Sequence, residues 1–542
     1  MPAASDPSRT AFSLGDLRFE VEHRRVGGAD GGPTLRVRDA GGGERLRFDC
    51  FRFQPHYHLC DAAGAHLRDA AGAHLRDAAG AHLRDEASPH GFGPVPDPVA
   101  WVIGQLRDDL PGYLARAGLP DTGPFDPQEL GRTLHAVELA LRNPPARFDD
   151  LDPALLHTRL SEKWHTYPAE IHPAWVAEMD FPLAEPVRVV LERAVDRFDV
   201  GYPIAPHETG LREAFCERMQ RLYGWDTKPA RVEVLTDVVQ GLYLGLLAWS
   251  APGDGAVIQT PIYPPFFDAV RETGRRLIEH RLQPRDTPRG HGSGDDRPGY
   301  ALDVDPLRER TDERTRVLLL CNPHNPTGRV FRRDELEAVA ALAHERDWVV
   351  VVDEIHQDLV FPPDRHIPFA TLSEDAAART VTLTSATKAF NIPGLRTAVA
   401  HFGSSDLQRR FNAAVPRHVR GGIGLLGLYA TIAAWRWGDP WLGELRTHLA
   451  ANRDLMLAFL AQELPEVRCQ PPEATYLAWL DFRALGLEPS PARFFYERAA
   501  VALSEGRKFG PGWEGFARLN FATSRSLLVE LLEKLAKAVR SR

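Results

Sequence analysis

The sequence lacks three features that would place it in a broad class of protein at once. Its 65 Lys and Arg stand against 74 Asp and Glu, so the net charge of -9 gives no electrostatic case for binding nucleic acid or an anionic membrane. No apolar run reaches the roughly 20 residues of a membrane span, and residues 1–10 lack the apolar core of a signal peptide. Five scattered cysteines are typical of reduced thiols rather than of a disulfide framework. We therefore expect a cytoplasmic protein with no membrane or nucleic-acid partner.

What the sequence does contain is a β-α-β pattern whose strands end in polar residues. Residues 316–321 and 348–352 are apolar runs that predict buried strands, and residues 333–345 between them have helical apolar spacing. The strands are followed by Asn322-Pro-His-Asn-Pro-Thr-Gly328 and by Asp353-Glu-Ile-His356. Because open α/β sheets bind ligands beyond the carboxyl ends of their parallel strands, these polar residues are site candidates.

A lysine follows a third apolar run. Residues 380–384 predict a short strand, and Lys388 comes shortly after it, between Thr and Ala. Desolvation and nearby cations lower the pKa of a lysine, which suits it to Schiff-base chemistry. Ser385 and Arg396 flank it and are candidates for holding a phosphate. This stretch alone leaves open an ordinary surface lysine in a polar loop.

Taken in order, these motifs resemble those of fold-type-I pyridoxal-phosphate (PLP) enzymes of the class I/II aminotransferase superfamily. The longer sequence motifs around these residues resemble those of the MalY/PatB branch, the cystathionine β-lyase-like C–S lyases. The resemblance runs from about residue 148 to the C-terminus. The matching phrases are Trp175-Val-Ala-Glu-Met-Asp-Phe181, Cys321-Asn-Pro-His-Asn-Pro-Thr-Gly-Arg329, Asp353-Glu-Ile-His-Gln-Asp-Leu-Val-Phe361, Lys388-Ala-Phe-Asn-Ile-Pro-Gly-Leu395, Thr475-Tyr-Leu-Ala-Trp-Leu-Asp481 and Phe516-Ala-Arg-Leu-Asn520.

The resemblance implies an α/β fold for residues 147–542. A large domain, about residues 195–430, would hold a mostly parallel seven-stranded sheet between helices. A smaller α+β domain would take residues 147–194 and 431–542. The family works as a homodimer, so Tyr202 would reach the cofactor from the neighbouring subunit.

The resemblance also implies a role for each residue of the cofactor site. Lys388 would hold PLP and move the Cα proton of the substrate, and Asp353 would keep the pyridine nitrogen protonated. Arg518 would pair with the substrate carboxylate, a geometry suited to guanidinium, and Trp175 would contact the substrate. The other expected cofactor contacts are Asn325 and His356 at the ring oxygen, Tyr263 on the ring face, and Val238, Val239, Ser385 and Arg396 at the phosphate.

The implied reaction is cleavage of an S-substituted L-cysteine to a thiol, pyruvate and ammonia. Three positions depart from the family pattern. The family's Glu-Gly-Thr-Tyr is here Glu473-Ala-Thr-Tyr476. Asp237 stands where the family usually has Gly, and an acidic side chain is unwelcome at a phosphate seat; Arg396 is more typical of general aminotransferases. Two alternatives therefore stay open: an aminotransferase, which would need a 2-oxo acid, and a PLP-binding regulatory protein that works by binding a partner.

Residues 1–146 lie outside the resemblance. Strand-like residues 12–23 and 35–52 and helical residues 101–117 and 127–142 predict a small α+β module of unknown role. An octapeptide, Asp61-Ala-Ala-Gly-Ala-His-Leu-Arg68, then occurs twice more without change up to residue 84. We expect an exposed or partly helical loop there. A row of metal sites formed by its histidines is disfavoured, because histidines spaced eight residues apart do not lie on the same face of an α-helix. Residues 56–60 (His-Tyr-His-Leu-Cys) likewise favour polar strand residues over a metal site.

Overall fold

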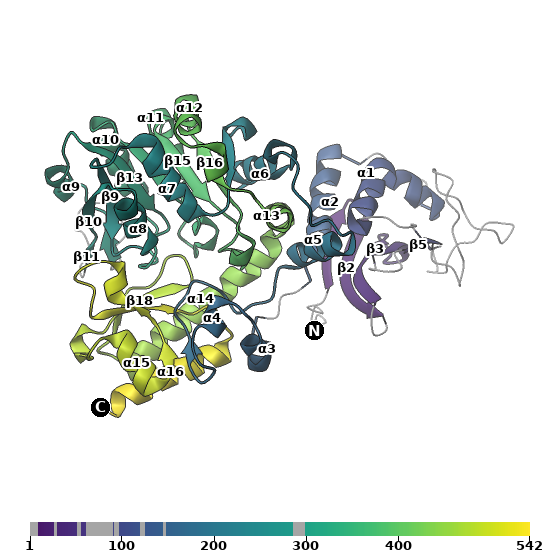
Figure 1. The fold of residues 1–542 in the computed structure, drawn as a ribbon. Coiled ribbons are helices and arrows are strands. Elements are labelled where there is room, and N and C mark those ends of the chain that lie inside the picture. The colour runs from purple at the N-terminus through teal and green to yellow at the C-terminus, as the bar shows by residue number, and fades with distance from the viewer. Residues whose placement is uncertain are drawn as a thin grey trace. The chain divides into compact units, whose positions relative to one another are not determined.

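The computed structural model describes residues 9–26, 30–50, 56–60, 90–91, 97–119, 125–144, 148–285 and 299–542. The chain divides into two compact units, Met1–Ala146 and Arg147–Arg542 (Figure 1). The octapeptide copies at residues 61–84 lie outside the described residues, as do residues 286–298, a stretch rich in Pro and Gly. Within the described ranges, no helix combines the length and the apolar character needed to cross a membrane.

The first unit is an antiparallel sheet covered by two helices. Its strands follow one another in chain order: β1 (Arg9–Leu14), β2 (Leu17–Val26), β3 (Asp30–Arg38), β4 (Glu44–Asp49), β5 (His56–Leu59) and β6 (His90–Gly91). Alternate residues such as Phe19 and Phe48 are buried together with apolar residues of α1 (Pro98–Arg116) and α2 (Pro127–Arg142). On the opposite face, His58 Nε2 lies 2.8 Å from Arg47 Nη2, so this histidine belongs to a polar strand pair.

The second unit is built on a seven-stranded sheet. Its strand order is β10 (Arg276–Arg281), β9 (Gly255–Thr260), β13 (Thr315–Cys321), β14 (Val349–Asp353), β15 (Thr380–Thr384), β16 (Ala398–Phe402) and β8 (Val232–Leu235). The first five strands are mutually parallel, whereas β16 runs antiparallel to both of its neighbours. Every residue of β9, β14 and β15 is buried, as expected for a sheet covered on both faces. The predicted mostly parallel seven-stranded sheet is confirmed.

Helices cover both faces of this sheet (Figure 1). One apolar core joins it to α7 (Val238–Trp249), α8 (Pro265–Glu272) and α12 (Ser405–Ala414). A second core on the other face joins it to α9 (Asp305–Arg310), α10 (Arg333–Glu345) and α11 (Glu374–Ala378). The helix α13 (Leu425–Trp437) packs against both α5 (Glu185–Asp196) and α6 (Leu211–Tyr223), and α6 lies beside β8. The strands β11 (Gln283–Arg285) and β12 (Gly299–Ala301) form a separate two-stranded antiparallel sheet.

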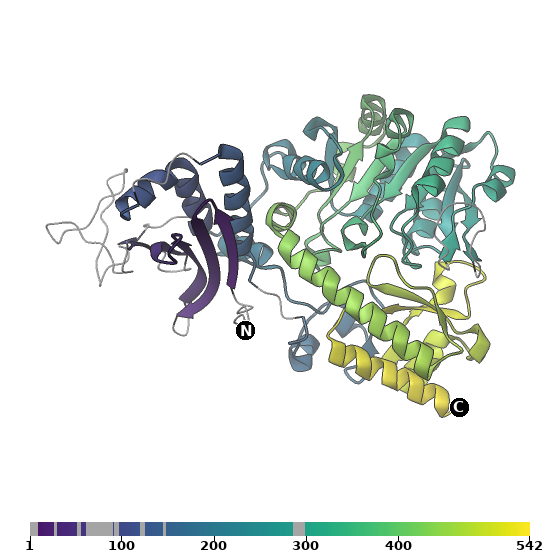
Figure 2. The ribbon, with the colours of Figure 1, turned by 180° about the vertical axis from the view of Figure 1, so that it is seen from behind.

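The rest of the second unit is a smaller α+β region. A four-stranded sheet has the order β17 (Arg468–Cys469), β18 (Leu477–Asp481), β21 (Phe516–Asn520) and β20 (Ser504–Glu505). The helices α14 (Asp439–Glu463), α15 (Pro491–Ala499) and α16 (Arg525–Arg540) pack with it, α14 and α16 side by side (Figure 2). Residues 148–181, which carry α3 (Pro153–His157), α4 (Glu162–His165) and β7 (His172–Pro173), join this region through the pairing of β7 with β19 (Val501–Ala502).

Two helix ends have local causes. A break at Gly438 separates α13 from α14: Pro440 stands in the first turn of α14, and a Cβ at Gly438 would lie 2.3 Å from the ring of Phe390. The helix α7 begins at Val238, because the side chain of Asp237 accepts a hydrogen bond from Gln240 N and caps the helix there.

Candidate functional site

A cavity of about 970 Å³ opens at the carboxyl ends of β13, β14 and β15. Its lining includes Asn325 after β13, Asp353 and His356 after β14, and Ser385 and Lys388 after β15. Three polar segments that are far apart in the sequence thus meet at one edge of the sheet, where open α/β folds bind ligands. The volume is typical of a small-molecule site.

Lys388 is one of the residues that line this cavity. Its Nζ donates a hydrogen bond of 2.8 Å to the carbonyl of Ala177, which also accepts one of 3.0 Å from the Tyr476 hydroxyl. Burial, followed by the nearby Arg518 guanidinium, lowers the pKa of Lys388 to about 8. Roughly a tenth of the amine is therefore neutral at pH 7, far more than for an ordinary lysine, and the neutral form is the one that attacks carbonyl carbons and accepts protons.

Asp353 ends β14 as a buried carboxyl group. Its Oδ1 accepts a hydrogen bond of 3.0 Å from Ile355 N, but burial outweighs this and raises the pKa of Asp353 to about 7. His356, one turn further on, is also buried, and burial lowers its pKa to about 3, so the ring is neutral. Its Nδ1 has no hydrogen-bond partner among the described residues. Both side chains line the cavity, where a bound polar ligand would meet them.

The amino end of α7 and the turn after β15 form the other end of the cavity. Val238 and Val239, the first residues of α7, line it, and amides of a first helical turn have no partner within the helix. Ser385 Oγ donates to Thr397 O at 2.6 Å and accepts from Thr387 N at 3.1 Å. Arg396 is exposed and forms an ion pair with Asp237.

Arg518 lies on β21, in the smaller region, behind Asn325: it contacts that lining residue but is not itself part of the cavity lining. Its Nη1 donates to Asn325 Oδ1 at 2.8 Å, and its Nη2 donates to the carbonyl of Trp175 at 2.9 Å and to Ser504 Oγ at 3.2 Å. Burial lowers the pKa of Arg518 to about 10, so it stays cationic at neutral pH. The structure thus brings Arg518 and Asn325 together, while Trp175 takes part through its backbone carbonyl.

The two predicted tyrosines differ in position. Tyr263 lines the cavity, and burial raises the pKa of its hydroxyl. Tyr202 is fully exposed, with a relative accessibility of 101%, in a segment that also exposes Phe198 at 89%. Within the described part of one chain, Tyr202 therefore contributes nothing to the cavity that Lys388 lines.

Sequence reasoning missed the residues that hold the segment at 175–181 against the cavity. Asn391 accepts from Met179 N at 2.9 Å and donates to the carbonyls of Met179 and Phe181. Asn520 donates to the carbonyls of Val176 and Glu178 at 2.7 and 2.6 Å. Both asparagines stand inside the matching motifs around Lys388 and Arg518, and this was the available signal.

The donor set fits PLP. A buried carboxyl whose pKa lies near neutrality suits a pyridine nitrogen, and neutral His356 and Asn325 lie beside it for the ring oxygen. Tyr263 lines the same cavity and has an aromatic ring that could stack on the PLP ring. The first amides of α7, with Ser385, Thr387 and Arg396, offer the contacts that phosphate prefers. Lys388 lines the same cavity as this donor set.

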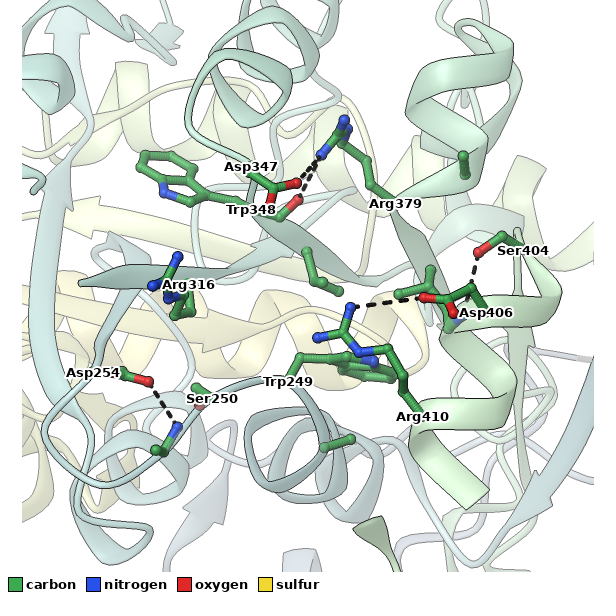
Figure 3. A pocket seen from close by; sticks show the side chains of 15 residues that line it. Trp249, Ser250, Asp254, Arg316, Asp347, Trp348, Arg379, Ser404, Asp406 and Arg410 are labelled. Atoms are coloured by element: carbon green, nitrogen blue, oxygen red, sulfur yellow. Dashed lines mark hydrogen bonds and ion pairs between the residues drawn. The ribbon is translucent and has the colours of Figure 1, made fainter. Parts of the chain in front are cut away.

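A second hollow of about 710 Å³ lies at the opposite edge of the same sheet, where β9, β13, β14 and β15 begin (Figure 3). Its charged side chains largely pair with one another: Arg379 lies 3.5 Å from Asp347, and Arg410 lies 3.9 Å from Asp406. This hollow is separate from the one that Lys388 lines.

Comparison with known proteins agrees with the geometry. The profile of the class I and II aminotransferases matches residues 185–535, and that of a domain of unknown function, DUF7700, matches residues 11–71. Cystathionine β-lyase PatB from Bacillus subtilis (strain 168) is 36% identical over 369 residues, which are 68% of this chain and 92% of PatB. The crystal structure of OvoB is 36% identical with a TM-score of 0.66, and covers 73% of this chain and 99% of OvoB.

A second solved structure, cystalysin from Treponema denticola, is 29% identical with a TM-score of 0.67. It covers 73% of this chain and 99% of its own, and it contains a pyridoxal 5'-phosphate cofactor. The chain therefore belongs to the class I and II aminotransferase family, in the branch that contains PatB. The predicted family and the fold-type-I architecture are confirmed.

Proposed function

We propose that the protein is a PLP-dependent C–S β-lyase that cleaves S-substituted L-cysteines of the L-cystathionine type. In the balanced reaction, RS–CH2–CH(NH3+)–COO− and one water give RSH, pyruvate and NH4+. The supporting observation is Lys388, an amine with a pKa near 8 that lines one cavity with Asp353 and the first residues of α7 and is influenced by the charge of Arg518, in a chain 36% identical to PatB. When bound, PLP supplies the electron sink for the Cα carbanion.

The chain's own residues orient the substrate and move its proton. Arg518, already forked toward Asn325 and the Trp175 carbonyl, is placed to pair with the substrate carboxylate. That pairing fixes the Cα–H bond relative to Lys388. Neutral Nζ then accepts the Cα proton as general base, which a lysine with a pKa near 8 performs well at neutral pH. Loss of the thiolate from Cβ follows.

We also propose that the enzyme is a cytoplasmic homodimer whose sites are completed across the subunit interface. The segment at 195–204 exposes Val195, Phe198, Val200, Tyr202 and Ile204, all at more than half of their full accessibility. Several large apolar side chains exposed in one segment are typical of an interaction surface. A second copy packed there supplies Tyr202 to the neighbouring cavity. Scattered cysteines support a reducing compartment.

The proposal is tested by incubating the PLP-loaded enzyme with L-cystathionine and no 2-oxo acid. Pyruvate and free thiol, appearing together at equal rates, are expected. Turnover only after addition of a 2-oxo acid, with no thiol released, contradicts the lyase and assigns an aminotransferase. Bound cofactor without turnover in either assay favours the regulatory protein.

A further inference from the structure

The mouth of the cavity carries charged side chains that the proposed chemistry does not use. Arg159, Glu162 and Glu178 line the same cavity as Lys388. Arg159 and Glu178 are half-buried and Glu162 is exposed. A guanidinium and two carboxylates thus share one cavity, and within the described ranges none of these side chains forms an ion pair or a hydrogen bond. Their charges remain available to a ligand.

A buried ion pair holds these groups in place. Lys163 Nζ lies 2.9 Å from Asp180 Oδ1, and Trp164 Nε1 donates to the same oxygen at 2.6 Å. Both partners of the ion pair are almost completely buried, and breaking such a pair leaves an uncompensated charge in the protein interior. The pair fastens α4 to the segment that contains Glu178. Glu162, on α4, and Arg159, just before it, therefore stand at defined positions.

The carboxylates lie close enough to the reaction centre to act on it. Glu178 and Glu162 both raise the pKa of Lys388, against the larger lowering by burial and by Arg518. Ser161 Oγ, beside Glu162, is buried and has no hydrogen-bond partner in the described part of the chain. The cavity lining thus contains a guanidinium, two carboxylates and an unpaired hydroxyl, and both carboxylates are close enough to Lys388 to shift its pKa.

We propose that Arg159, Glu162 and Glu178 form a subsite for the leaving group, and that it selects S-substituents carrying both a carboxylate and an ammonium group. Arg159 receives the distal carboxylate, and Glu178 and Glu162 receive the distal ammonium. This inference rests on the proposed lyase activity and names its substrate class. An S-alkyl cysteine offers these groups no partner and leaves them hydrated.

Two arginines would then recognise the two carboxylates of the substrate separately. Arg518 takes the carboxylate next to the reacting carbon, while Arg159 takes the one at the far end of the leaving group. Binding energy from a remote part of the substrate can be used to orient the reacting centre. Charge-assisted hydrogen bonds are strong enough to give this selectivity.

The test compares L-cystathionine with S-ethyl-L-cysteine, whose leaving group is uncharged. In Arg159→Ala and in Glu178→Gln, the ratio of kcat/KM for the two substrates is expected to fall at least tenfold, or about 1.4 kcal/mol. Arg498→Ala, which removes an exposed arginine on α15 away from the cavity, is the matched control and keeps the wild-type ratio. A ratio within twofold of wild type in both test variants overturns the subsite.

A binding measurement separates this inference from the lyase proposal. Lys388→Ala protein supplied with PLP is titrated with each compound by calorimetry, because it binds without turnover. Adding Arg159→Ala is expected to raise the Kd for L-cystathionine about tenfold relative to that for S-ethyl-L-cysteine. Equal changes for both compounds overturn the subsite. Absence of pyruvate from wild-type enzyme contradicts the lyase proposal but leaves this binding result to decide the subsite.

Discussion

Asp237 and Arg396 form an ion pair at the amino end of α7, although 159 positions separate them in the sequence. The other oxygen of Asp237 accepts a hydrogen bond of 2.7 Å from Gln240 N. The carboxylate that looked unwelcome beside a phosphate is therefore a helix cap whose charge is offset by the neighbouring guanidinium. A bound phosphate competes with Asp237 for the same arginine.

Replacing Asp237 by Asn is expected to tighten PLP binding. Asn preserves the cap through its side-chain oxygen, while it removes a negative charge near the phosphate and frees Arg396. The Kd for PLP, measured by reconstituting cofactor-free protein and following absorbance, should fall about three- to tenfold. Arg396→Ala should raise it. Weaker binding in Asp237→Asn would mean that Asp237 chiefly holds Arg396 in place.

Asp353 should make the stability of cofactor-free protein depend on pH. Its folded-state pKa, about 7, lies above the ordinary value, so the folded form binds a proton more tightly than the unfolded form. The stabilisation is complete below about pH 4 and is lost as the pH rises toward 7. Asp353→Asn abolishes this dependence. The Tm of Asp353→Asn relative to that of the wild type should therefore increase between pH 5 and pH 8. A Tm difference that stays constant over this range would contradict the assignment.

Arg518→Lys tests the recognition of the substrate carboxylate. Lys keeps the charge but loses the planar fork that contacts Asn325 and the Trp175 carbonyl. Because this interaction orients the reacting bond, kcat/KM for every S-substituted cysteine should fall about 100-fold. The affinity for PLP, measured separately, should change by less than threefold. A drop limited to L-cystathionine would instead place Arg518 at the leaving group.

Mixed dimers test the contribution of Tyr202. Lys388→Ala and Tyr202→Ala homodimers are each expected to be impaired. In a mixed dimer, the cavity that keeps Lys388 receives Tyr202 from the other subunit. Co-expression of differently tagged chains and purification of the mixed dimer should restore about half of the wild-type activity per dimer. Activity no higher than that of the Tyr202→Ala homodimer would contradict a shared site.

The strands that position the site could be predicted because they are unbroken apolar runs followed by polar residues. Leu318, Val351 and Thr382 belong to three such runs, and the sheet places their carboxyl ends together. Lys388, Asp353 and Asn325 could be found for the same reason, since each follows one of these strands within a short distance.

Features that depend on distant contacts could not be predicted. Asp237 pairs with Arg396 across 159 positions, and Asn520 anchors Val176 across 344 positions. The ring of Phe390 leaves room only for a glycine at Gly438, and no local pattern reveals this contact. The free charges of Arg159 and Glu178 became visible only when the fold placed them in the cavity of Lys388.

The most direct test of the central claim is the stoichiometry of a single turnover at pH 8. PLP-loaded enzyme in excess is mixed with L-cystathionine without any 2-oxo acid, and pyruvate, ammonia and thiol are measured. One equivalent of each per substrate is expected, with none from Lys388→Ala. Consumption of L-cystathionine without release of thiol would contradict the account.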